Sequence, residues 1–460
     1  MAEQRDAGRT ATGDLAGPES LREMVAAQKR GEPRGVFSVC SANPHVLDAA
    51  LQTASALGTT LLVEATSNQV NQEGGYTGAT PADFAASLKQ RALAAGLRPD
   101  RVLFGGDHLG PHPWSSEPCA KAMEKAREMV RHYVRAGAAK IHLDASMNLA
   151  DDPAGALEPS TAAERTADLC AAAESVRADG AEGPVYVIGT EVPPPGGERD
   201  DAAGPEVTRP QDATRTLELT REAFGRRGLE EAWERVVGLV VQPGVEFGDE
   251  RVHEYDPPAA RPLVGLIESV PGIVYEAHST DYQRDEGLRD LVRDHFAILK
   301  VGPWLTFAFR EAVFALEAME LEWLGGRSGV TLSDLGHVVD DAMQRDPAHW
   351  KAYYRGDEAR LRFARRFSFS DRIRYYWPRP EVDAALNRLL ANLEAHPPPL
   401  PLLSQHLPGS YRAVREGRIS ARPGDLVCFH IREVVEIYSR ACAGTSDPQP
   451  GPSPEQPMLL

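Results

Sequence analysis

The chain has 460 residues, of which 42% are hydrophobic and 25% charged, and its formal net charge at pH 7 is −17. This length and composition predict a sizeable folded core and exclude a small module or a disordered chain. The negative charge argues against nucleic acid as a partner, although a few basic groups or a helix N-terminus can still hold one small anion.

Cysteine usage and hydropathy bear on the compartment. Five cysteines are scattered along the chain without a CxxC pair, which is typical of reduced thiols rather than of a disulfide framework. The first residues contain no apolar stretch of the signal-peptide kind, and no apolar run approaches the ~20 residues that a membrane span needs. We therefore expect a cytoplasmic protein that has no membrane partner.

Short apolar runs recur along the chain, and helical patterns fill the gaps between them. Strands that alternate with helices predict βαβ units, because parallel neighbours need a crossover connection. Eight such units are the number that closes a barrel, so we predict an α/β fold of the (β/α)8 TIM-barrel type over a doubly wound open sheet. The eight runs cover residues 36–40, 60–66, 101–108, 140–146, 185–191, 236–242, 273–279 and 296–302.

The two ends of the chain differ from this repeating part. Residues 1–18 are polar and residues 444–460 are rich in proline, so we expect both to be disordered tails. The barrel is expected over 19–329, with the apolar segment 309–324 as its last helix. The segment 330–443 is predicted to be a mainly helical C-terminal extension that packs on the barrel.

Alternation along the strands sorts their polar side chains. In a closed parallel barrel, successive residues face the lumen and the helices in turn. Lys140, His142 and Asp144 share one face of their strand and apolar residues share the other, so these three side chains are predicted to face the lumen. Several charges converging at the carboxyl ends of strands, where barrels place active sites, indicate a metal or ligand site. The other members of this predicted set are Glu64, Asp107, His108, Glu191, Glu276 and His278.

The dipeptide Asp107–His108 ends the third predicted strand. An imidazole such as His108 can bind a divalent metal while the neighbouring Asp107 moves a proton on a substrate hydroxyl. A metal at this place would polarise the carbonyl of a ketose and stabilise an enediolate. We predict His278, Asp144 and Glu191 as further ligands, a nitrogen and oxygen set that favours Zn²⁺, with Mn²⁺ or Mg²⁺ as alternatives.

Lysine chemistry is a weaker alternative. A Schiff base needs a lysine in the lumen, and Lys140 and Lys300 are the two that qualify. Each is better explained as a charge partner or a phosphate contact. For Lys140 and His142, which lie deeper in their strand, a satisfied structural ion pair is as good an interpretation as a functional role.

A phosphate on the substrate would need its own contacts. The loop that leads from the eighth strand to a helix N-terminus is a usual phosphate site in barrels, so Lys300 and the backbone after Gly302 are candidates. Arg372 and Arg374 are further candidates, but they could instead hold the C-terminal extension in place.

Carboxylate, hydroxyl and amide groups near the strand ends are the predicted contacts of a sugar. We predict a catalytic carboxylate and substrate contact at Glu64. Glu246 is an alternative proton acceptor to Asp107, or simply a loop residue that caps the next segment. Neither a dinucleotide-binding motif nor a P-loop motif occurs in the chain. The predicted hydrogen-bonding contacts are Ser67, Asn68, Gln242, Ser279 and Asp281.

Longer motifs add a resemblance to these observations. They are ATSNQVNQEGGYTGATPADF (65–84), GGDHLGP (105–111), KIHLDASM (140–147), YVIGTEVPPPGG (186–197), VVQPGVEF (240–247), EAHSTDYQ (276–283), HFAILKVGP (295–303) and SFSDRIRYYWP (368–378). From about residue 20 to 440 the chain resembles the GatZ/KbaZ family, whose members are described as the non-catalytic subunit of class II D-tagatose-1,6-bisphosphate aldolase. The resemblance implies a TIM barrel, a role in tagatose or galactitol breakdown, and a separate catalytic aldolase subunit as a partner.

The resemblance also carries expectations for single residues. Class II aldolases have an Asp-His pair at the end of the third strand, where the aspartate transfers a proton and the histidine binds metal, and Asp107 and His108 match it. His278 matches a second histidine ligand more loosely. Strand five ends in Glu191, where the catalytic subunits have a histidine, so the site with three histidine ligands is not reproduced. This departure weakens the case for aldolase activity of the chain alone.

Three functions remain open. The chain could support a separate aldolase subunit, it could be a metal-dependent 4-epimerase or aldolase for a ketohexose or its phosphate, or it could be a barrel that has lost its chemistry. So many ionisable side chains in one cavity, kept at a cost in stability, favour the second function over the third. In an epimerase, Asp107 or Glu246 would take the proton of the C4 hydroxyl, the C3–C4 bond would break, and re-addition would follow on the other face. We also expect a homo-oligomer.

Overall fold

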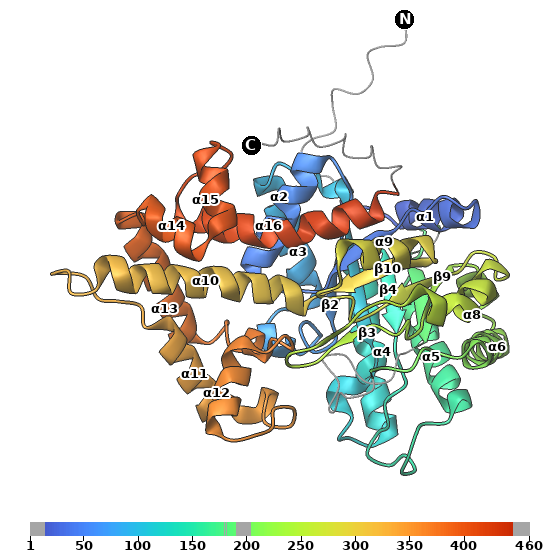
Figure 1. Cartoon of the computed structure of the whole chain (residues 1–460). Coiled ribbons are helices and arrows are strands. Elements are labelled where there is room, and N and C mark those ends of the chain that lie inside the picture. Colours follow the sequence, from blue (N-terminus) through green and yellow to red (C-terminus); the bar gives the residue numbers. More distant parts are fainter. Residues whose placement is uncertain (1–13, 179, 181, 190–203, 445–460) are drawn as a thin grey trace, which may run out of the picture.

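A computed structural model of the chain describes residues 14–178, 180, 182–189 and 204–444. Eight parallel strands close into a barrel, in the order β1-β10-β9-β6-β5-β4-β3-β2, and helices surround it (Figure 1). The predicted TIM barrel is therefore confirmed. The strands are β1 (Val36–Val39), β2 (Leu61–Thr66), β3 (Val102–Leu109), β4 (Lys140–Leu143), β5 (Val185–Gly189), β6 (Val236–Val240), β9 (Val274–Ala277) and β10 (Phe296–Val301).

Helices connect the strands, and their ends follow local signals in the sequence. The side chain of Asn43 accepts hydrogen bonds from the first backbone amides of α2, and Gly58 ends that helix with a φ of 65°. Thr80 and Asp83 form a reciprocal capping box at the start of α3. The connecting helices are α2 (Pro44–Leu57), α3 (Pro81–Ala94), α4 (Cys119–Arg135), α5 (Pro159–Glu174), α6 (Pro210–Arg226), α7 (Glu230–Trp233), α8 (Pro257–Glu268) and α9 (Asp285–Arg293).

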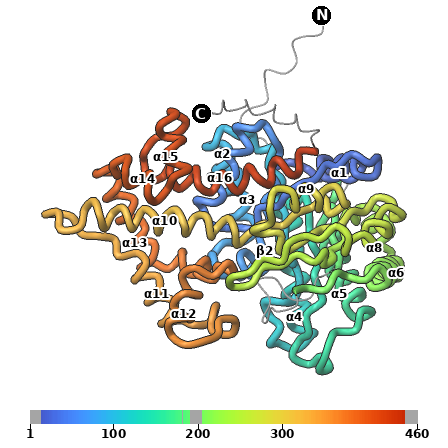
Figure 2. The backbone as a smooth tube through the Cα atoms, in the orientation of Figure 1, coloured from blue at the N-terminus to red at the C-terminus, as the bar shows by residue number. Residues whose placement is uncertain are grey.

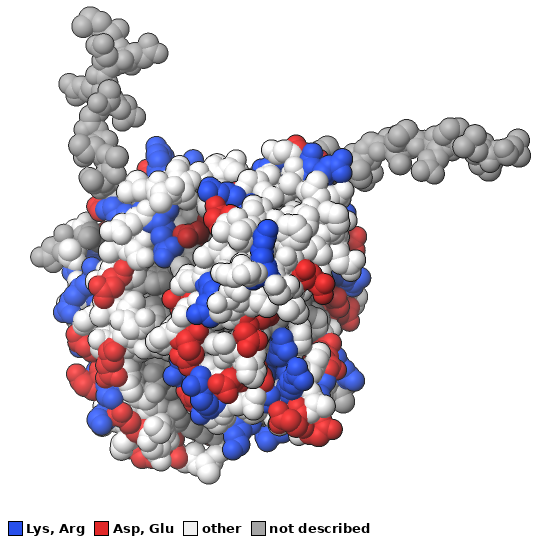
Figure 3. All heavy atoms as spheres, turned by 90° about the vertical axis from the view of Figure 1, so that its left-hand side faces the viewer, with Lys and Arg blue, Asp and Glu red and all other residues white. Residues whose placement is uncertain are grey.

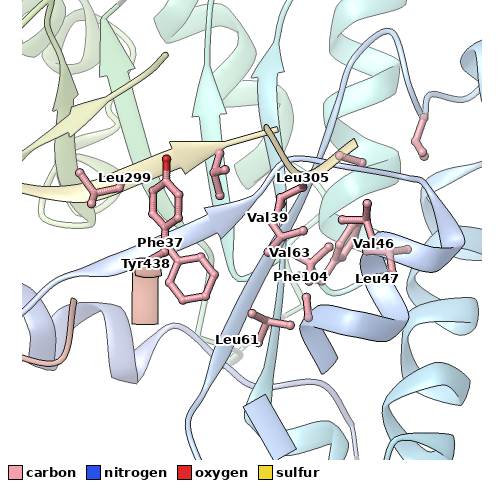
Figure 4. Packing of buried hydrophobic residues seen from close by; sticks show 14 of the residues in the cluster. Phe37, Val39, Val46, Leu47, Leu61, Val63, Phe104, Leu299, Leu305 and Tyr438 are labelled. Atoms are coloured by element: carbon pink, nitrogen blue, oxygen red, sulfur yellow. The ribbon is translucent and has the colours of Figure 1, made fainter. Parts of the chain in front are cut away.

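The strands show the alternation that a barrel requires. Val63 of β2 and Phe104 of β3 point outward and pack in one cluster with Val46 and Leu47 of α2 (Figure 4). Leu62, one residue along β2, belongs to a separate cluster inside the barrel. Because side chains alternate, Glu64 then also faces the lumen.

Helix α1 (Glu19–Lys29) covers the amino-terminal end of the barrel. Its Leu21, Met24 and Val25 share the inner apolar cluster with residues of the strands, among them Leu62. The lumen is thus filled by apolar side chains at this end. Polar groups are concentrated toward the opposite end, where the strands finish.

The last helix of the described chain, α16 (Pro423–Cys442), completes the ring of helices around the barrel. It packs against α2, α9 and β1, and its Tyr438 ring lies 5.7 Å from the ring of Phe37 on β1. The segment 309–324, expected to take this place, belongs to α10 (Pro303–Leu324). This helix packs against α16 and extends away from the barrel (Figures 1 and 2). The C-terminal extension therefore supplies the eighth barrel helix.

The rest of the extension is helical, as predicted, and lies beside the barrel near α10. Figure 3 shows basic and acidic side chains interspersed over this side of the molecule. Among the described residues no helix is both long and apolar enough to cross a membrane. The further elements are α11 (Leu335–Arg345), α12 (Glu358–Phe367), α13 (Pro380–Ala395), α14 (Leu400–His406) and α15 (Pro408–Arg415), the short ribbon β7 (Glu246–Phe247) with β8 (Val252–His253), and the 3₁₀ turns η1 (Gly75–Thr77), η2 (Pro99–Arg101), η3 (His112–Trp114), η4 (Pro347–His349) and η5 (Arg372–Tyr375).

Candidate metal and sugar site

A buried network of charges fills the lumen where the strands approach their carboxyl ends. Lys140 Nζ lies 2.7 Å from Glu64 Oε1 and 2.7 Å from Glu276 Oε2, and all three side chains are fully buried. Lys300 Nζ lies 2.5 Å from the second oxygen of Glu64. Lys140 could be either a structural ion-pair partner or a functional residue, and the structure shows the ion pair. Glu64, a predicted substrate contact, has both oxygens on lysines and does not line the cavity described below.

Lys300 joins this network to Asp107. Its Nζ lies 2.9 Å from Asp107 Oδ1. Burial acts to lower the pKa of Lys300, but the carboxylates of Asp107, Glu64 and Glu276 outweigh burial and hold that pKa well above its usual value. An ammonium that stays protonated is no nucleophile, so the structure favours the charge-partner interpretation of Lys300 over Schiff-base chemistry.

Asp107 keeps its negative charge in this setting. Burial acts to raise the pKa of Asp107, but Lys300 and the neighbouring imidazole of His108 hold it well below its usual value. The carboxylate is therefore ionised at neutral pH. Its Oδ1 atom lies near Lys300 and near His142 Nδ1, at 3.2 Å from the latter.

Three imidazoles meet beside this carboxylate. Asp107, His108, His142 and His278 each offer a ligand atom, and the four atoms lie within 4.8 Å of one another. They come from β3, β4 and the residue after β9. His108 has a φ of 47° and lies within a shift in the register between β3 and β4, which runs from Gly106 to Leu109. Such an irregularity in a strand re-aims a side chain, and a left-handed residue other than glycine costs roughly 1–3 kcal/mol, which is typical of functional sites.

Hydrogen bonds on the far side of each ring decide which nitrogen faces its neighbours. His108 Nδ1 lies 2.7 Å from Asp144 Oδ2, so Nε2 is the atom directed at the cluster. His142 Nε2 lies 3.0 Å from the carbonyl of Gly189, which places the proton on Nε2 and the lone pair on Nδ1. His278 Nε2 lies 2.9 Å from the ionised Glu276, which assigns the lone pair to Nδ1 in the same way. Partners of this kind orient metal-binding histidines.

The surroundings of His278 and His108 shift the pKa values of these two rings in opposite directions. Burial lowers the pKa of His278 to about 4, so this ring is neutral and able to bind a metal at neutral pH. Burial also acts on His108, but the carboxylates of Asp107 and Asp144 outweigh it and raise the pKa of that ring above its usual value. These two carboxylates therefore favour the protonated form of His108.

Asp144, predicted as a ligand, has a supporting position instead. It is not one of the four clustered residues, and its two oxygens bind His108 and the hydroxyl of Ser146, the latter at 2.6 Å. Burial acts to raise the pKa of Asp144, but the hydrogen bond from His108 holds it well below the usual value. His142, which was left open between an ion pair and a functional role, lies in the cluster. Glu191 lies outside the described residues.

The cluster borders a cavity of about 880 Å³ at the carboxyl ends of the strands. A cavity of this size is within the ~300–1,000 Å³ that is usual for small-ligand sites. The hydroxyl of Ser67 is buried in its wall and has no hydrogen-bond partner in the described part of the chain. The predicted site residues that line the cavity are Ser67, Asn68, Asp107, His108, Asp144, His278, Ser279, Asp281, Lys300 and Arg374.

Three predicted contacts do not reach the cavity. Gln242 Oε1 accepts the backbone amides of Gly244 and Val245, at 2.8 and 3.0 Å, and so stabilises a turn. Glu246 Oε1 accepts the amide of the following residue at 2.9 Å, in line with its alternative role as a local cap. Arg372 donates to the carbonyl of His349 at 3.0 Å and thereby holds the extension together. All three residues lie outside the eight barrel strands. The alternation of strand residues therefore does not predict where their side chains point.

The backbone predicted to bind phosphate already has a partner. Asp281 Oδ1 accepts the amides of Gly302 and Trp304, at 3.0 and 2.7 Å, at the start of α10. In this structure a carboxylate from the loop after β9 therefore accepts the hydrogen bonds of the backbone that was a candidate phosphate contact.

Aromatic side chains in the wall were not predicted. Tyr76 lies in the loop after β2 and Tyr375 in the extension, and both line the cavity with ring centroids 5.3 Å apart. The glycines around Tyr76 indicated a turn, but nothing in the sequence paired it with a residue 299 positions later. The contact shows that the extension completes the mouth of the barrel.

Comparison with known proteins agrees with the fold. A crystal structure described as a probable tagatose 6 phosphate kinase from Sinorhizobium meliloti 1021 shares 44% identity with the chain, covers 89% of this chain and 100% of that chain, and has a TM-score of 0.81. Fructose-bisphosphate aldolase from Campylobacter jejuni (12% identity, 83% of this chain and 94% of that chain, TM-score 0.43) and the YdjI aldolase from Escherichia coli K12 (11%, 81% and 95%, 0.40) are more distant.

The family comparison covers nearly all of the described chain. Residues 21–443 match the family described as D-tagatose-1,6-bisphosphate aldolase subunit GatZ/KbaZ-like. This match confirms the resemblance that the motifs indicated. The chain belongs to the GatZ/KbaZ-like family of D-tagatose-1,6-bisphosphate aldolase subunits.

Proposed function

We propose that this subunit has a metal-dependent site of its own, which binds a ketohexose or its phosphate and catalyses a retro-aldol step. The observation that carries the proposal is that ligand atoms of Asp107, His108, His142 and His278 lie within 4.8 Å of one another. All of these residues except His142 line the cavity. A purely structural barrel gains nothing from three imidazoles and a carboxylate placed together beside a cavity.

The donor set fits a divalent transition metal. Imidazole nitrogens suit Zn²⁺ and also Mn²⁺, whereas Mg²⁺ prefers oxygen ligands. The three histidines would hold the ion, with Asp107 beside it. When bound, it would supply Lewis acidity toward the carbonyl of a ketose.

The groups of the chain itself can move the proton. Lys300 Nζ holds Asp107 Oδ1 from one side at 2.9 Å, and the ionised carboxylate would accept the proton of the C4 hydroxyl. The O4–H electron pair then forms the C4 carbonyl as the C3–C4 bond breaks, and the electrons of that bond pass into the C2 carbonyl to give an enediolate. The same carboxylate would return the proton to O4 when the C3–C4 bond forms again.

Two outcomes follow from this one cleavage. If the aldehyde turns before C3 adds to its other face, the product is the 4-epimer; if the aldehyde leaves, the reaction is an aldol cleavage. Support of a separate catalytic aldolase subunit is a second function, which the family description favours. The two functions are compatible, because a site inside the barrel leaves the outer surface for a partner.

Metal content and a sugar screen test the proposal directly. The purified full chain, stripped with a chelator and titrated with Zn²⁺ or Mn²⁺ by calorimetry, is expected to bind about one ion per chain. The loaded chain is then incubated with tagatose and fructose, free and phosphorylated, while C4 inversion and triose release are followed. A chain that binds no ion and turns over none of these sugars would contradict the proposal.

Replacing Asp144 by asparagine is expected to weaken metal affinity. The amide cannot hold the proton of His108 as the carboxylate does, and loss of such a supporting partner costs roughly 10- to 100-fold in affinity. Calorimetric titration with Zn²⁺ measures the change. Asp152→Asn is the control, because Asp152 lies in the same loop but pairs with Arg165 at 2.6 Å, away from the cluster. Equal affinities of the two variants would show that Asp144 does not support the site.

A further inference from the structure

The start of α10 is the place where a barrel of this kind can hold a phosphate, because backbone amides point outward there. In this chain the amides of Gly302 and Trp304 donate to Asp281 Oδ1. Asp281 is only 2% exposed and lines the cavity. Burial raises its pKa to about 6, so the carboxylate is still mainly ionised at neutral pH. A negative group of the protein therefore occupies the position that a phosphate would take.

The cations in the cavity wall are already engaged. Lys300 faces Glu64, Asp107 and Glu276. Arg374 donates to the carbonyls of Ser370 and Asp371, at 2.5 and 3.0 Å, and to the hydroxyl of Tyr375 at 3.1 Å.

The position of Asp281 in the wall points the same way. Asp107 and Asp144 lie beside the histidine cluster, where a metal ion would offset their charge, whereas Asp281 lies at the start of α10. The negative charge of Asp281 therefore opposes a phosphate dianion at that end of the cavity. An ionised carboxylate can only accept hydrogen bonds. Asp281 can therefore accept one from a sugar hydroxyl, but an ionised phosphate oxygen has no proton to donate to it.

We infer that the cavity selects a ketohexose that carries no phosphate at the end lying against β10 and α10, and that Asp281 determines this specificity. The inference rests on the proposed function, that the cavity binds a ketohexose, and narrows it to the unphosphorylated form. Asp281 acts in two ways. It accepts the hydrogen bonds of the first amides of α10, and it presents a negative carboxylate to the bound sugar.

A ketohexose 1,6-bisphosphate gives the sharpest test, because a phosphate must meet Asp281 whichever way round the sugar binds. The full chain loaded with Zn²⁺ is titrated by calorimetry at pH 7.5 with tagatose and with tagatose 1,6-bisphosphate. We expect the free sugar to bind at least about tenfold more tightly, since unmatched charge is excluded strongly from such sites. Equal or tighter binding of the bisphosphate would overturn the inference while leaving the proposed function intact. If neither sugar binds to the loaded chain, the proposed function fails, and the inference fails with it.

Two substitutions test the role of Asp281. Asp281→Asn keeps an oxygen for the amides of Gly302 and Trp304 but removes the charge, and Asp281→Gly exposes the amides. Both are expected to reduce the preference for free sugar about tenfold or more, by tighter binding of the bisphosphate. Asp357→Asn is the matched control, because Asp357 caps α12 through the amide of Arg360 at 2.9 Å and does not line the cavity. An unchanged preference in Asp281→Asn, with metal binding intact, would overturn the assignment.

Discussion

Lys140→Met is expected to lower the free energy of unfolding by about 3–5 kcal/mol, the usual cost of leaving a buried charge without its partner. Lys140 lies between Glu64 and Glu276, at 2.7 Å from each, and none of the three side chains is exposed. Methionine fills a similar volume, so the effect reports the lost charge and not a cavity. Unfolding by urea at pH 7, followed by circular dichroism, measures it.

The pH dependence of this loss has a definite sign. Burial acts to raise the pKa of Glu276, but Lys140 and Lys300 outweigh it and hold that pKa well below the usual 4.5. The native protein therefore loses this contribution as the pH falls below about 4.5 and through the lower pKa of the folded state. Without Lys140 the carboxyl group takes up a proton more readily, so the difference between the two proteins should narrow toward acid pH.

A surface lysine provides the control. Lys125 Nζ lies 2.7 Å from Glu117 Oε1, but both side chains are partly exposed. Lys125→Met is expected to cost less than about 1 kcal/mol, as exposed ion pairs do. If Lys140→Met cost no more than Lys125→Met at pH 7, the buried network would not be held together by charge.

The barrel could be predicted because two short-range patterns specify it. The strand β2 was expected over 60–66 and is Leu61–Thr66, since an apolar run bounded by polar residues is visible in the sequence. Alternation then placed Glu64 and Lys140 in the lumen correctly, because a period of two needs no knowledge of distant residues.

The partners of the lumenal groups could not be predicted in the same way. Whether Lys140 meets Glu64 or a ligand depends on distances across the barrel, which the sequence does not contain. Asp144 was expected to bind metal, yet it lies behind His108, while the deeper His142 joins the cluster. Strand alternation gives the side of the strand on which these residues lie but not their depth relative to one another.

Long-range packing decided the remaining differences. The helix α16 closes the barrel although more than a hundred residues separate it from β10, and local patterns do not show which helix fills this place. Asp281 reaches the start of α10 because β9 and β10 are neighbours in the sheet. The contact of Asp281 lies in the wall of the cavity, so the site depends on the fold more than on any one motif.

Asp107→Asn is expected to have the largest effect on the proposed reaction, a loss of about 10²- to 10⁴-fold in turnover, the usual contribution of a positioned proton acceptor. The amide oxygen can still accept from Lys300 at the position where the carboxylate lies 2.9 Å away, but it cannot take the proton of the C4 hydroxyl. The rate of C4 inversion or triose release from the ketohexose measures the loss. Since the three imidazoles remain, about one Zn²⁺ per chain should still bind by calorimetry.

That separation of metal binding from turnover is what distinguishes proton transfer by Asp107 from a structural role. Asp249→Asn serves as the control, because Asp249 accepts the hydroxyl of Ser368 at 2.7 Å and lies outside the cavity wall. Turnover equal to that of the unmodified chain in Asp107→Asn would exclude Asp107 as the acceptor. Loss of both metal and turnover would assign Asp107 to the ligand set instead, and the acceptor would then have to be sought among the other carboxylates of the wall, Asp144 and Asp281. Of these two, Asp281 has the pKa nearer to neutral, about 6, and is the stronger base.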